Sequence, residues 1–386
     1  MWDVFCNVID NYGDAGVCWR LARILRHEHG CEVRLWIDDL GALQKLHGAI
    51  DVEAARQTAA GIEVRQWTPR ISEDPVEPGE VVIEAFGCAL PESFIHAMAQ
   101  RSTPPVWLNL EYLSAESWTS GCHKLASPHP RLPLTKYFFF PGFRADTGGL
   151  LREQNLCEAR DRFQECNRPV YWEMLGLPPP TGDEIRISLF SYENAALPSL
   201  LDAWAAGSTP VTVLVPEGRV LPQLCAYFGA NQMAPGDCLR KGRLSVQVLP
   251  FVEQDAYDRL LWACDFNFVR GEDSFVRAQW AGKPFVWHIY PQAEQAHVLK
   301  LEAFLAVYCA QMAPPLARAV RTLFADWNGH SDTPDGASAW ADALSRQFAW
   351  RTSSQEWADR LAAGNELASE LVKFAQAHVN SRPFVK

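Results

Sequence analysis

Apolar stretches of strand length recur through the first half of the chain, and each is followed by a helix-compatible or loop stretch. Trp2 to Ile9 is apolar enough for a buried strand, residues 10–16 form a polar, glycine-bearing turn, and Val17 to His29 has a helical pattern. Further strands are predicted at CEVRLWID, VVIEAFG, PVWLNLEYL and YFFFPGF. Strands that alternate with crossovers indicate a parallel α/β sheet.

A second series of elements begins after the stretch LGLPPPTGDE, whose prolines end the preceding helix and form a stiff connector. Strands are predicted at IRISLF, PVTVLV, RLSVQVLPFV, DFNFVR and KPFVWHIY, and helices at ALPSLLDAWAAG and AYDRLLWAC. From about Gln295 onward the pattern is almost entirely helical.

The two series predict an α/β fold with two Rossmann-like domains that face each other across a cleft, followed by a helical C-terminal tail. A chain of 386 residues is also long enough for two cores. We expect an N-terminal domain at residues 1–176, a linker at 177–184 and a C-terminal domain at 185–352. A final helix at 353–386 is expected to pack back toward the first domain.

Composition and charge exclude several classes of protein. The formal net charge of −11 argues against nucleic-acid binding, which needs clustered Lys and Arg, and suits a partner with a basic patch. The 11 cysteines include no Cys-x-x-Cys pair, which is typical of reduced thiols. No signal-peptide pattern or membrane-length apolar run is present, so we expect a soluble cytoplasmic protein that does not bind membranes.

Two acidic turns follow predicted strands, at the edge where ligands of such sheets bind. Asp10 and Asp14 belong to the first turn, which lacks the Gly-x-Gly-x-x-Gly pattern of dinucleotide-binding proteins. The two carboxylates could form a functional pair, or Asp14 could simply cap the following helix. Both interpretations stay open on the turn alone.

The second acidic turn, Arg270 to Ser274, combines a cation, a glycine, two carboxylates and a hydroxyl. Backbone N–H groups at a helix start can hold a phosphate, and the guanidinium of Arg270 could add to that site. Glu272 and Asp273 suit hydroxyls or a cation better. The alternative is again an ordinary helix start whose acidic residues complement the helix dipole.

Aromatic residues at loop positions of the second half could hold a flat base, namely Phe190 and Tyr192 in SLFSYEN and Phe251 and Tyr257 in PFVEQDAYD. The alternative for Phe190 and Phe251 is that they are buried strand ends. The histidines show no metal-binding spacing, and the Gly-x-Ser-x-Gly elbow of serine hydrolases is missing. A reaction without a metal is therefore favoured.

Four stretches carry a resemblance to a known family: VIDNYGDAGVCWRLARIL, SLFSYEN, PFVEQDAYDRLLWACDFNFV and, most specifically, RGEDSFVRAQWAGKPFVWHIYPQ. The chain resembles the EarP family, the protein-arginine rhamnosyltransferases that modify bacterial translation elongation factor P. The resemblance implies a GT-B glycosyltransferase that moves rhamnose from dTDP-β-L-rhamnose to an arginine of elongation factor P, with inversion and without a metal or other cofactor. We expect the enzyme to be monomeric.

The resemblance also implies site residues. The essential carboxylates fall on Asp10, Asp14 and Glu272. Donor-binding positions fall on Asn11, Tyr12, Gly13, Phe190, Tyr192, Phe251, Gln254, Tyr257, Arg270, Gly271, Asp273, Ser274 and Tyr290. Position 257 is tyrosine here, whereas phenylalanine also occurs in the family, so base stacking should be retained.

Asp14 is the first choice for the general base, Asp10 would orient the guanidinium of the acceptor, and Glu272 could stabilise a cationic transition state. Two other functions stay open at this point. A nucleotide-sugar epimerase would share the architecture and the donor site, and a non-catalytic module would only bind elongation factor P or a nucleotide.

Overall fold

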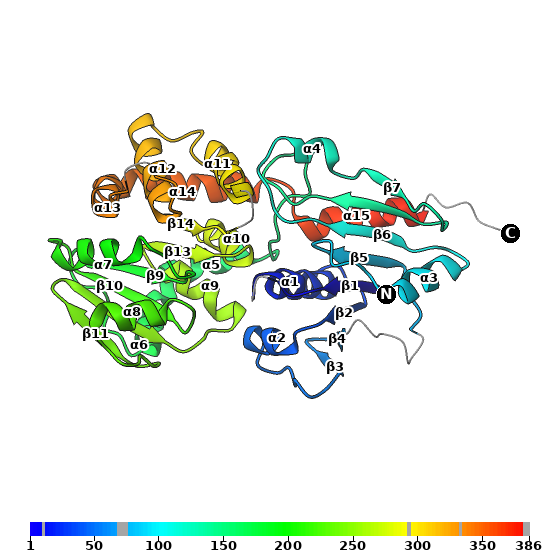
Figure 1. Ribbon diagram of the computed structural model, residues 1–386, viewed down its shortest axis with the longest axis horizontal. Helices are drawn as coiled ribbons and strands as arrows, with labels where there is room; N and C mark the ends of the chain where they lie inside the picture. The colour runs from blue at the N-terminus through cyan, green and yellow to red at the C-terminus, as the bar shows by residue number, and fades with distance from the viewer. Residues whose placement is uncertain (10–11, 68–75, 292–294, 332–333, 381–386) are drawn as a thin grey trace. The chain divides into compact units, whose positions relative to one another are not determined.

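The computed structural model describes residues 1–9, 12–67, 76–291, 295–331 and 334–380, and it divides the chain into two compact units (Figure 1). The first unit comprises residues 1–154 together with residues 363–386. The second unit comprises residues 155–362. Each unit contains one sheet with helices packed against it.

The first unit is built on an eight-stranded sheet in the order β3-β4-β2-β1-β5-β6-β8-β7. The strands are β1 (Trp2–Cys6), β2 (Val33–Ile37), β3 (Arg56–Ala59), β4 (Ile62–Gln66), β5 (Val81–Ala85), β6 (Val106–Leu110), β7 (Ala126–Pro128) and β8 (Thr135–Phe139). All pairings are parallel except those of the two outermost strands, β3 and β7. The four central strands are buried along their whole length, which explains their continuous apolar sequences.

Helices cover both faces of this sheet. The helices of this unit are α1 (Gly13–His27), α2 (Leu40–Leu46), α3 (Glu92–Gln100), α4 (Trp118–Cys122) and α15 (Leu367–Asn380). On one face, α1, α2 and α15 share a core with the strands. On the other face, Phe94 of α3 packs against Phe5 and Trp36 of the sheet. This is the layered arrangement of a Rossmann-like fold.

The last helix of the chain is tied to the first unit by a close approach of two backbone segments. Leu367 donates its N–H to the carbonyl of Leu150, and residue 150 forms a parallel bridge with Glu366. Gly149 has φ +77, and a Cβ at this position would lie 2.0 Å from the carbonyl oxygen of Asn365. Only glycine fits here, so the sequence of this turn sets where α15 can dock.

The second unit has a six-stranded sheet in the order β11-β12-β10-β9-β13-β14, parallel except for β11. Its strands are β9 (Ile185–Leu189), β10 (Val211–Pro216), β11 (Cys238–Lys241), β12 (Leu244–Leu249), β13 (Phe266–Arg270) and β14 (Phe285–His288). Its helices are α5 (Leu156–Arg162), the π-helix η1 (Phe163–Asn167), α6 (Arg168–Met174), α7 (Leu197–Ala206), α8 (Leu221–Phe228), α9 (Gln254–Ala263), α10 (Asp273–Trp280), α11 (Ala296–Tyr308), α12 (Pro314–Trp327), α13 (Gly336–Ser345) and α14 (Gln347–Ala362).

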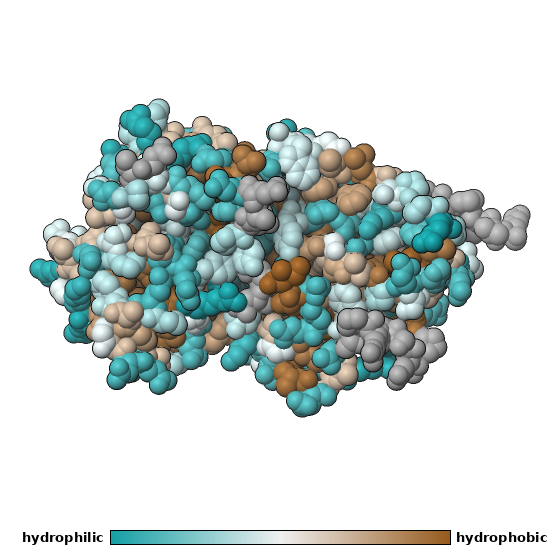
Figure 2. All heavy atoms as spheres, viewed as in Figure 1, coloured by the Kyte–Doolittle hydropathy of each residue, from teal (hydrophilic) through white to brown (hydrophobic). Residues whose placement is uncertain are grey.

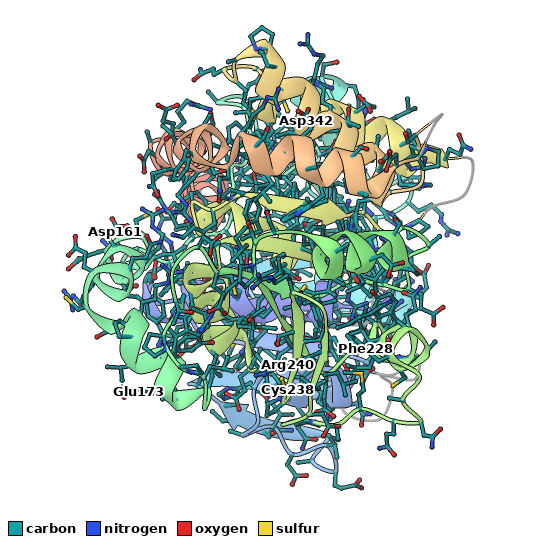
Figure 3. The ribbon with its side chains drawn as sticks, turned by 90° about the vertical axis from the view of Figure 1, so that its left-hand side faces the viewer. Asp161, Glu173, Phe228, Cys238, Arg240 and Asp342 are labelled. Carbon is teal, nitrogen blue, oxygen red and sulfur yellow. The ribbon has the colours of Figure 1, made fainter. Side chains whose placement is uncertain are left out.

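Alternating residues of β13 show that this sheet too is covered on both faces. Phe268 packs against Trp204 of α7 and Trp327 of α12. The neighbouring side chain of Asn267 points to the other face, where it donates to the carbonyl of Leu261 in α9. Figure 3 shows the outer residues of this unit, with Asp161 of α5 and Glu173 of α6 on one side and Phe228 of α8 on the other.

The predicted strands of both sheets are present, but the units divide the chain at other residues than the predicted domains do. Residues 155–176, predicted in the first domain, belong to the second unit. Packing explains this, because Phe163 lies edge-on against Trp262 at 5.6 Å and Arg168 donates to the carbonyl of Ala263. The predicted linker at 177–184 lies within the second unit.

The final predicted segment also differs in its starting point. Residue 353 lies inside α14, a helix of the second unit, and the helix that packs in the first unit is α15. The helix predicted from Val17 begins four residues earlier, at Gly13, and therefore includes Asp14.

Apolar side chains on the surface are scattered. Figure 2 shows hydrophobic areas on the visible face that are small and interspersed with hydrophilic residues. All eleven cysteines are free, and only Cys166 and Cys238 are exposed. Within the described ranges, no helix combines the length and the apolar character that crossing a membrane would require.

One buried ion pair of the first unit allows a test of the fold. Asp3 is fully buried and accepts hydrogen bonds from Arg34, from the indole of Trp36 and from the N–H of Gly79. We expect Asp3→Asn to lower the free energy of unfolding of the first unit by about 3–5 kcal/mol, because it leaves a buried guanidinium without its counter-charge. Chemical denaturation measures this change.

The matched control is Asp146→Asn, since Asp146 pairs with Arg144 at the surface of the same unit. Its stability should equal that of the wild type. Equal stabilities of the Asp3 variant and the control would show that the buried pair is not needed to hold the amino ends of β1 and β2 together.

Candidate active site

Most of the predicted donor-binding residues follow strands of the second sheet at one edge. Phe190 comes directly after β9, Phe251 follows β12, and Tyr290 follows β14. Arg270 is the last residue of β13. Because these strands are parallel, their carboxyl ends lie along the same edge, where sheets of this type bind ligands.

The guanidinium of Arg270 contacts two aromatic rings. Its Cζ is 4.6 Å from the ring centroid of Phe190 and 4.6 Å from that of Tyr192, and the residue is only 3% exposed. The N–H of Phe190 donates to the carbonyl of Phe268, which continues the β9–β13 pairing up to the ring. Cation–π contact with both rings stabilises the charge and fixes the direction of the side chain. We call Phe190, Tyr192 and Arg270 the aromatic clamp.

The second acidic turn connects β13 to α10. Gly271 adopts φ +63, and its carbonyl accepts a hydrogen bond from the indole of Trp287. Ser274 Oγ donates to the carbonyl of Arg270 at 2.8 Å. Asp273 accepts from Gln254 Nε2 at 2.9 Å, which joins the first residues of α10 and α9. Side chains of the turn itself, of α9 and of β14 thus hold the turn close to the clamp.

Glu272 has a different position from its neighbours in this turn. It is the N-cap residue of α10, but its side chain makes no capping hydrogen bond to the helix. Its carboxylate is partly exposed at the helix start. Glu272 thus lies at the helix start without capping it, and the alternative in which it complements the helix dipole stays open.

Three further predicted aromatic residues lie near the clamp or at the same sheet edge. The ring of Tyr257 is 5.6 Å from that of Phe190, and burial raises the pKa of the Tyr257 hydroxyl. Tyr290 is 41% exposed, with its ring 5.7 Å from that of Tyr192. Phe251 is half-buried, and its N–H donates to Glu217, which follows β10. Phe190 is also only half-buried, so neither phenylalanine is the fully buried strand end of the alternative.

One residue of this site escaped the sequence analysis. His288 is the last residue of β14, pairs in register with Arg270 and lies with its ring centroid 5.2 Å from that of Tyr192. Burial and the nearby positive charge of Arg270 lower the pKa of His288 to about 4. A single histidine in an apolar strand forms no spaced motif that the sequence could show. Its position at the end of the strand was the one feature that could have identified it.

In the first unit, Asp14 lies in the first turn of α1 and is buried. Its Oδ2 accepts the N–H of Ile9 at 2.8 Å, and Asp38 in turn accepts the N–H of Val8 at 2.9 Å. The two carboxylates thus hold residues 8 and 9, which follow β1. Asp14 is not the helix cap, since Tyr12 is the N-cap residue and Gly13 begins the helix.

Asp10 and Asn11 lie outside the described residues, so the carboxylate pair of the first turn stays a prediction. In the parts of the chain that the structure describes, no group of three or more His, Cys, Asp or Glu side chains could hold a metal ion.

Two Rossmann-like units of this kind are characteristic of the GT-B fold. The MurG structure from Acinetobacter baumannii has the same fold, with a TM-score of 0.52 at 14% identity over 97% of this chain and 99% of that one. A family model described as "Elongation-Factor P (EF-P) rhamnosyltransferase EarP" matches residues 2–376. The chain belongs to this family and is therefore an enzyme.

Its relatives agree with this assignment. A protein-arginine rhamnosyltransferase from Pseudomonas aeruginosa is 50% identical, over 97% of this chain and 98% of its own length. One from Shewanella oneidensis is 39% identical, over 97% of both chains. A solved structure described as "Structural basis for EarP-mediated arginine glycosylation of translation elongation factor EF-P" has a TM-score of 0.69 at 38% identity and covers 99% of each chain. Membership of this family favours a glycosyltransferase over both alternatives, the epimerase and the non-catalytic module.

The environment of His288 predicts its titration. An exposed histidine is half-protonated near pH 6.5, whereas the lowered pKa keeps His288 neutral until the pH approaches 4. Because the folded protein binds this proton more weakly than the unfolded chain does, this residue favours folding above pH 6.5, and that contribution is lost as the pH falls toward 4. NMR of labelled histidines measures the midpoint, with the resonance identified by its loss in His288→Asn. A midpoint near 6.5 would mean that the imidazole is solvated and not beside the clamp.

Proposed function

We propose that this enzyme transfers rhamnose from dTDP-β-L-rhamnose to an arginine side chain of translation elongation factor P, with inversion and without a metal or other cofactor. The observation that carries the proposal is the aromatic clamp, which presents a buried cation beside the start of α10. The names of the relatives, which specify arginine and rhamnose, support the acceptor and the sugar. Translation takes place in the cytoplasm, so we place the enzyme there, as a monomer.

The second unit offers hydrogen-bond donors and a positive charge, which a nucleoside diphosphate needs. The first N–H groups of α10 are not used within the helix and can donate to phosphate oxygens, and the helix dipole favours the negative charge. Arg270 supplies the cation and Ser274 a hydroxyl close to the same turn. Phe251 and Tyr257 would contact the thymine ring, with Gln254, Asp273 and Tyr290 completing the donor site.

The acceptor side requires carboxylates. Arginine is a poor nucleophile because its pKa is above about 12 and its charge is spread over three nitrogens. Asp10 would bind the guanidinium, and Glu272 would stabilise the positive charge that develops on the sugar. Asp14 would accept the proton. The hydrogen bond from Ile9 fixes the rotamer of Asp14, so the base is oriented before the substrate binds.

The transfer of the sugar needs no reactant besides the two substrates and these residues. A guanidinium nitrogen forms a bond to the anomeric carbon from the face opposite the diphosphate, and the bond from that carbon to the diphosphate oxygen breaks. The electron pair leaves with dTDP, whose added negative charge is stabilised by Arg270 and the start of α10. The nitrogen loses its proton to Asp14.

Intact-mass spectrometry of elongation factor P tests the function directly. After incubation with the enzyme and dTDP-rhamnose, the factor should gain the mass of one deoxyhexose, and fragmentation should place the sugar on an arginine. The same gain is expected with EDTA present, because no step uses a metal. An unmodified factor, or a gain that requires added divalent metal, would contradict the proposal.

The role of Asp14 can be separated from its contact with the turn. Asp14→Asn keeps the shape of the side chain and can still accept from Ile9, but it removes the base. We expect transfer to fall by about 100-fold or more, the usual scale for a general base, with unchanged thermal stability.

Asp38→Asn is the matched control, because Asp38 accepts from the neighbouring residue Val8 without a proposed role in proton transfer. This variant should retain most of the transfer rate. Equal losses in both variants would show that the two carboxylates act only by holding the turn.

A further inference from the structure

Three buried polar atoms near the aromatic clamp have no hydrogen-bond partner among the residues that the structure describes. They are Nδ1 of His288, the hydroxyl of Ser191 and the hydroxyl of Tyr257. The three residues are between 1% and 9% exposed. Buried polar groups in native proteins are nearly always hydrogen-bonded, because an unmade bond costs free energy. Three such atoms around the clamp point to a ligand that completes them.

His288 has the best-defined position of the three. It is the register partner of Arg270 across the parallel β13–β14 pair, so the two side chains emerge on the same face of the sheet. The preceding residue, Trp287, points to the opposite face, where it stacks on Phe275 at 3.8 Å. The imidazole lies edge-on to Tyr192 at 5.2 Å and to Trp327 at 5.9 Å. Two rings and a strand therefore fix its orientation.

The charge state of this imidazole determines what it can bind. Arg270 and burial disfavour its protonation, so the ring is neutral at physiological pH. A neutral imidazole carries one N–H donor and one acceptor nitrogen. Beside a guanidinium that has only N–H donors, a donating Nδ1–H suits a ligand with acceptor oxygens. A diphosphate provides such oxygens.

We propose that His288 is a further donor-binding residue, whose Nδ1–H donates a hydrogen bond to the diphosphate of the sugar nucleotide that Arg270 receives. The proposal rests on the proposed function, which supplies the ligand. Ring packing alone accounts for the contacts of His288 with Tyr192 and Trp327. It does not explain why a buried Nδ1 has no hydrogen-bond partner among the described residues.

Two substitutions separate the nitrogen from the ring. His288→Asn loses the ring but places an amide N–H close to the position of Nδ1, whereas His288→Phe keeps the ring and loses the nitrogen. Calorimetric titration with dTDP should give His288→Asn an affinity within about threefold of the wild type. His288→Phe should bind about tenfold or more weakly, the scale of a lost hydrogen bond to a charged group. Thermal unfolding of each variant is the control for folding.

A purely structural role predicts the reverse order, with His288→Phe equal to the wild type and His288→Asn weakened. That order would overturn the proposal, and so would equal losses in both variants, because the nitrogen would then not decide the affinity. If the wild type itself fails to bind dTDP, the proposed donor is wrong and this inference fails with it. Wild-type binding that His288→Phe leaves unchanged would overturn the inference about His288 alone.

Discussion

A guanidinium that is removed from water costs free energy unless other groups stabilise its charge, and the second unit is arranged to meet this requirement at Arg270. The rings of Phe190 and Tyr192 both contact the cation. Tyr192 also lies against His288 and Tyr290, and Phe190 against Tyr257. Residues that follow three different strands are thus organised around one charge. The proposed donor site depends on that charge staying in place.

Both units use the same relation between a buried strand and its following helix. In the first unit β1 leads to α1, and Asp14 lies at the helix start. In the second unit β13 leads to α10, and Glu272 lies at the helix start. One turn carries a buried carboxylate bound to its own backbone, and the other carries a carboxylate that does not cap its helix. The fold therefore places one carboxylate at the start of a helix in each unit, and the roles proposed for the two carboxylates stay predictions.

The sequence predicted most of the fold because the central strands are continuous apolar runs. It missed β3, β4, β7 and β11. Strands β3, β7 and β11 are short and largely exposed, and β4 has polar residues at alternate positions, so none of the four is a continuous apolar run. The start of α1 was predicted too late, because Gly13 and the carboxylate of Asp14 look like turn residues until the burial of Asp14 is known. The boundaries of the units also depend on contacts between residues that are far apart in the sequence, such as Phe163 and Trp262.

In the site, the residues of the clamp lie together because β9 and β13 are parallel and bring their carboxyl ends to one edge. The place of His288 in the site could not be predicted from the sequence. It depends on the register of β14 against β13, which pairs His288 with Arg270, and the sequence of one strand does not show that register. The roles of the predicted residues depend on a bound donor and acceptor. They remain predictions, and so does the position of Asp10.

The contact between Gly149 and Asn365 has a consequence for the order in which the protein can be made. The apolar core of the first unit includes Leu367 and Leu371 of the last helix, and this helix reaches the core through that glycine turn. During synthesis, residues 155–362 are complete before α15 exists, so the second unit can fold while the first still exposes part of its core to water. The N-terminal unit is therefore finished last, and a ribosome that stops early releases a chain whose first-made half is the unstable one.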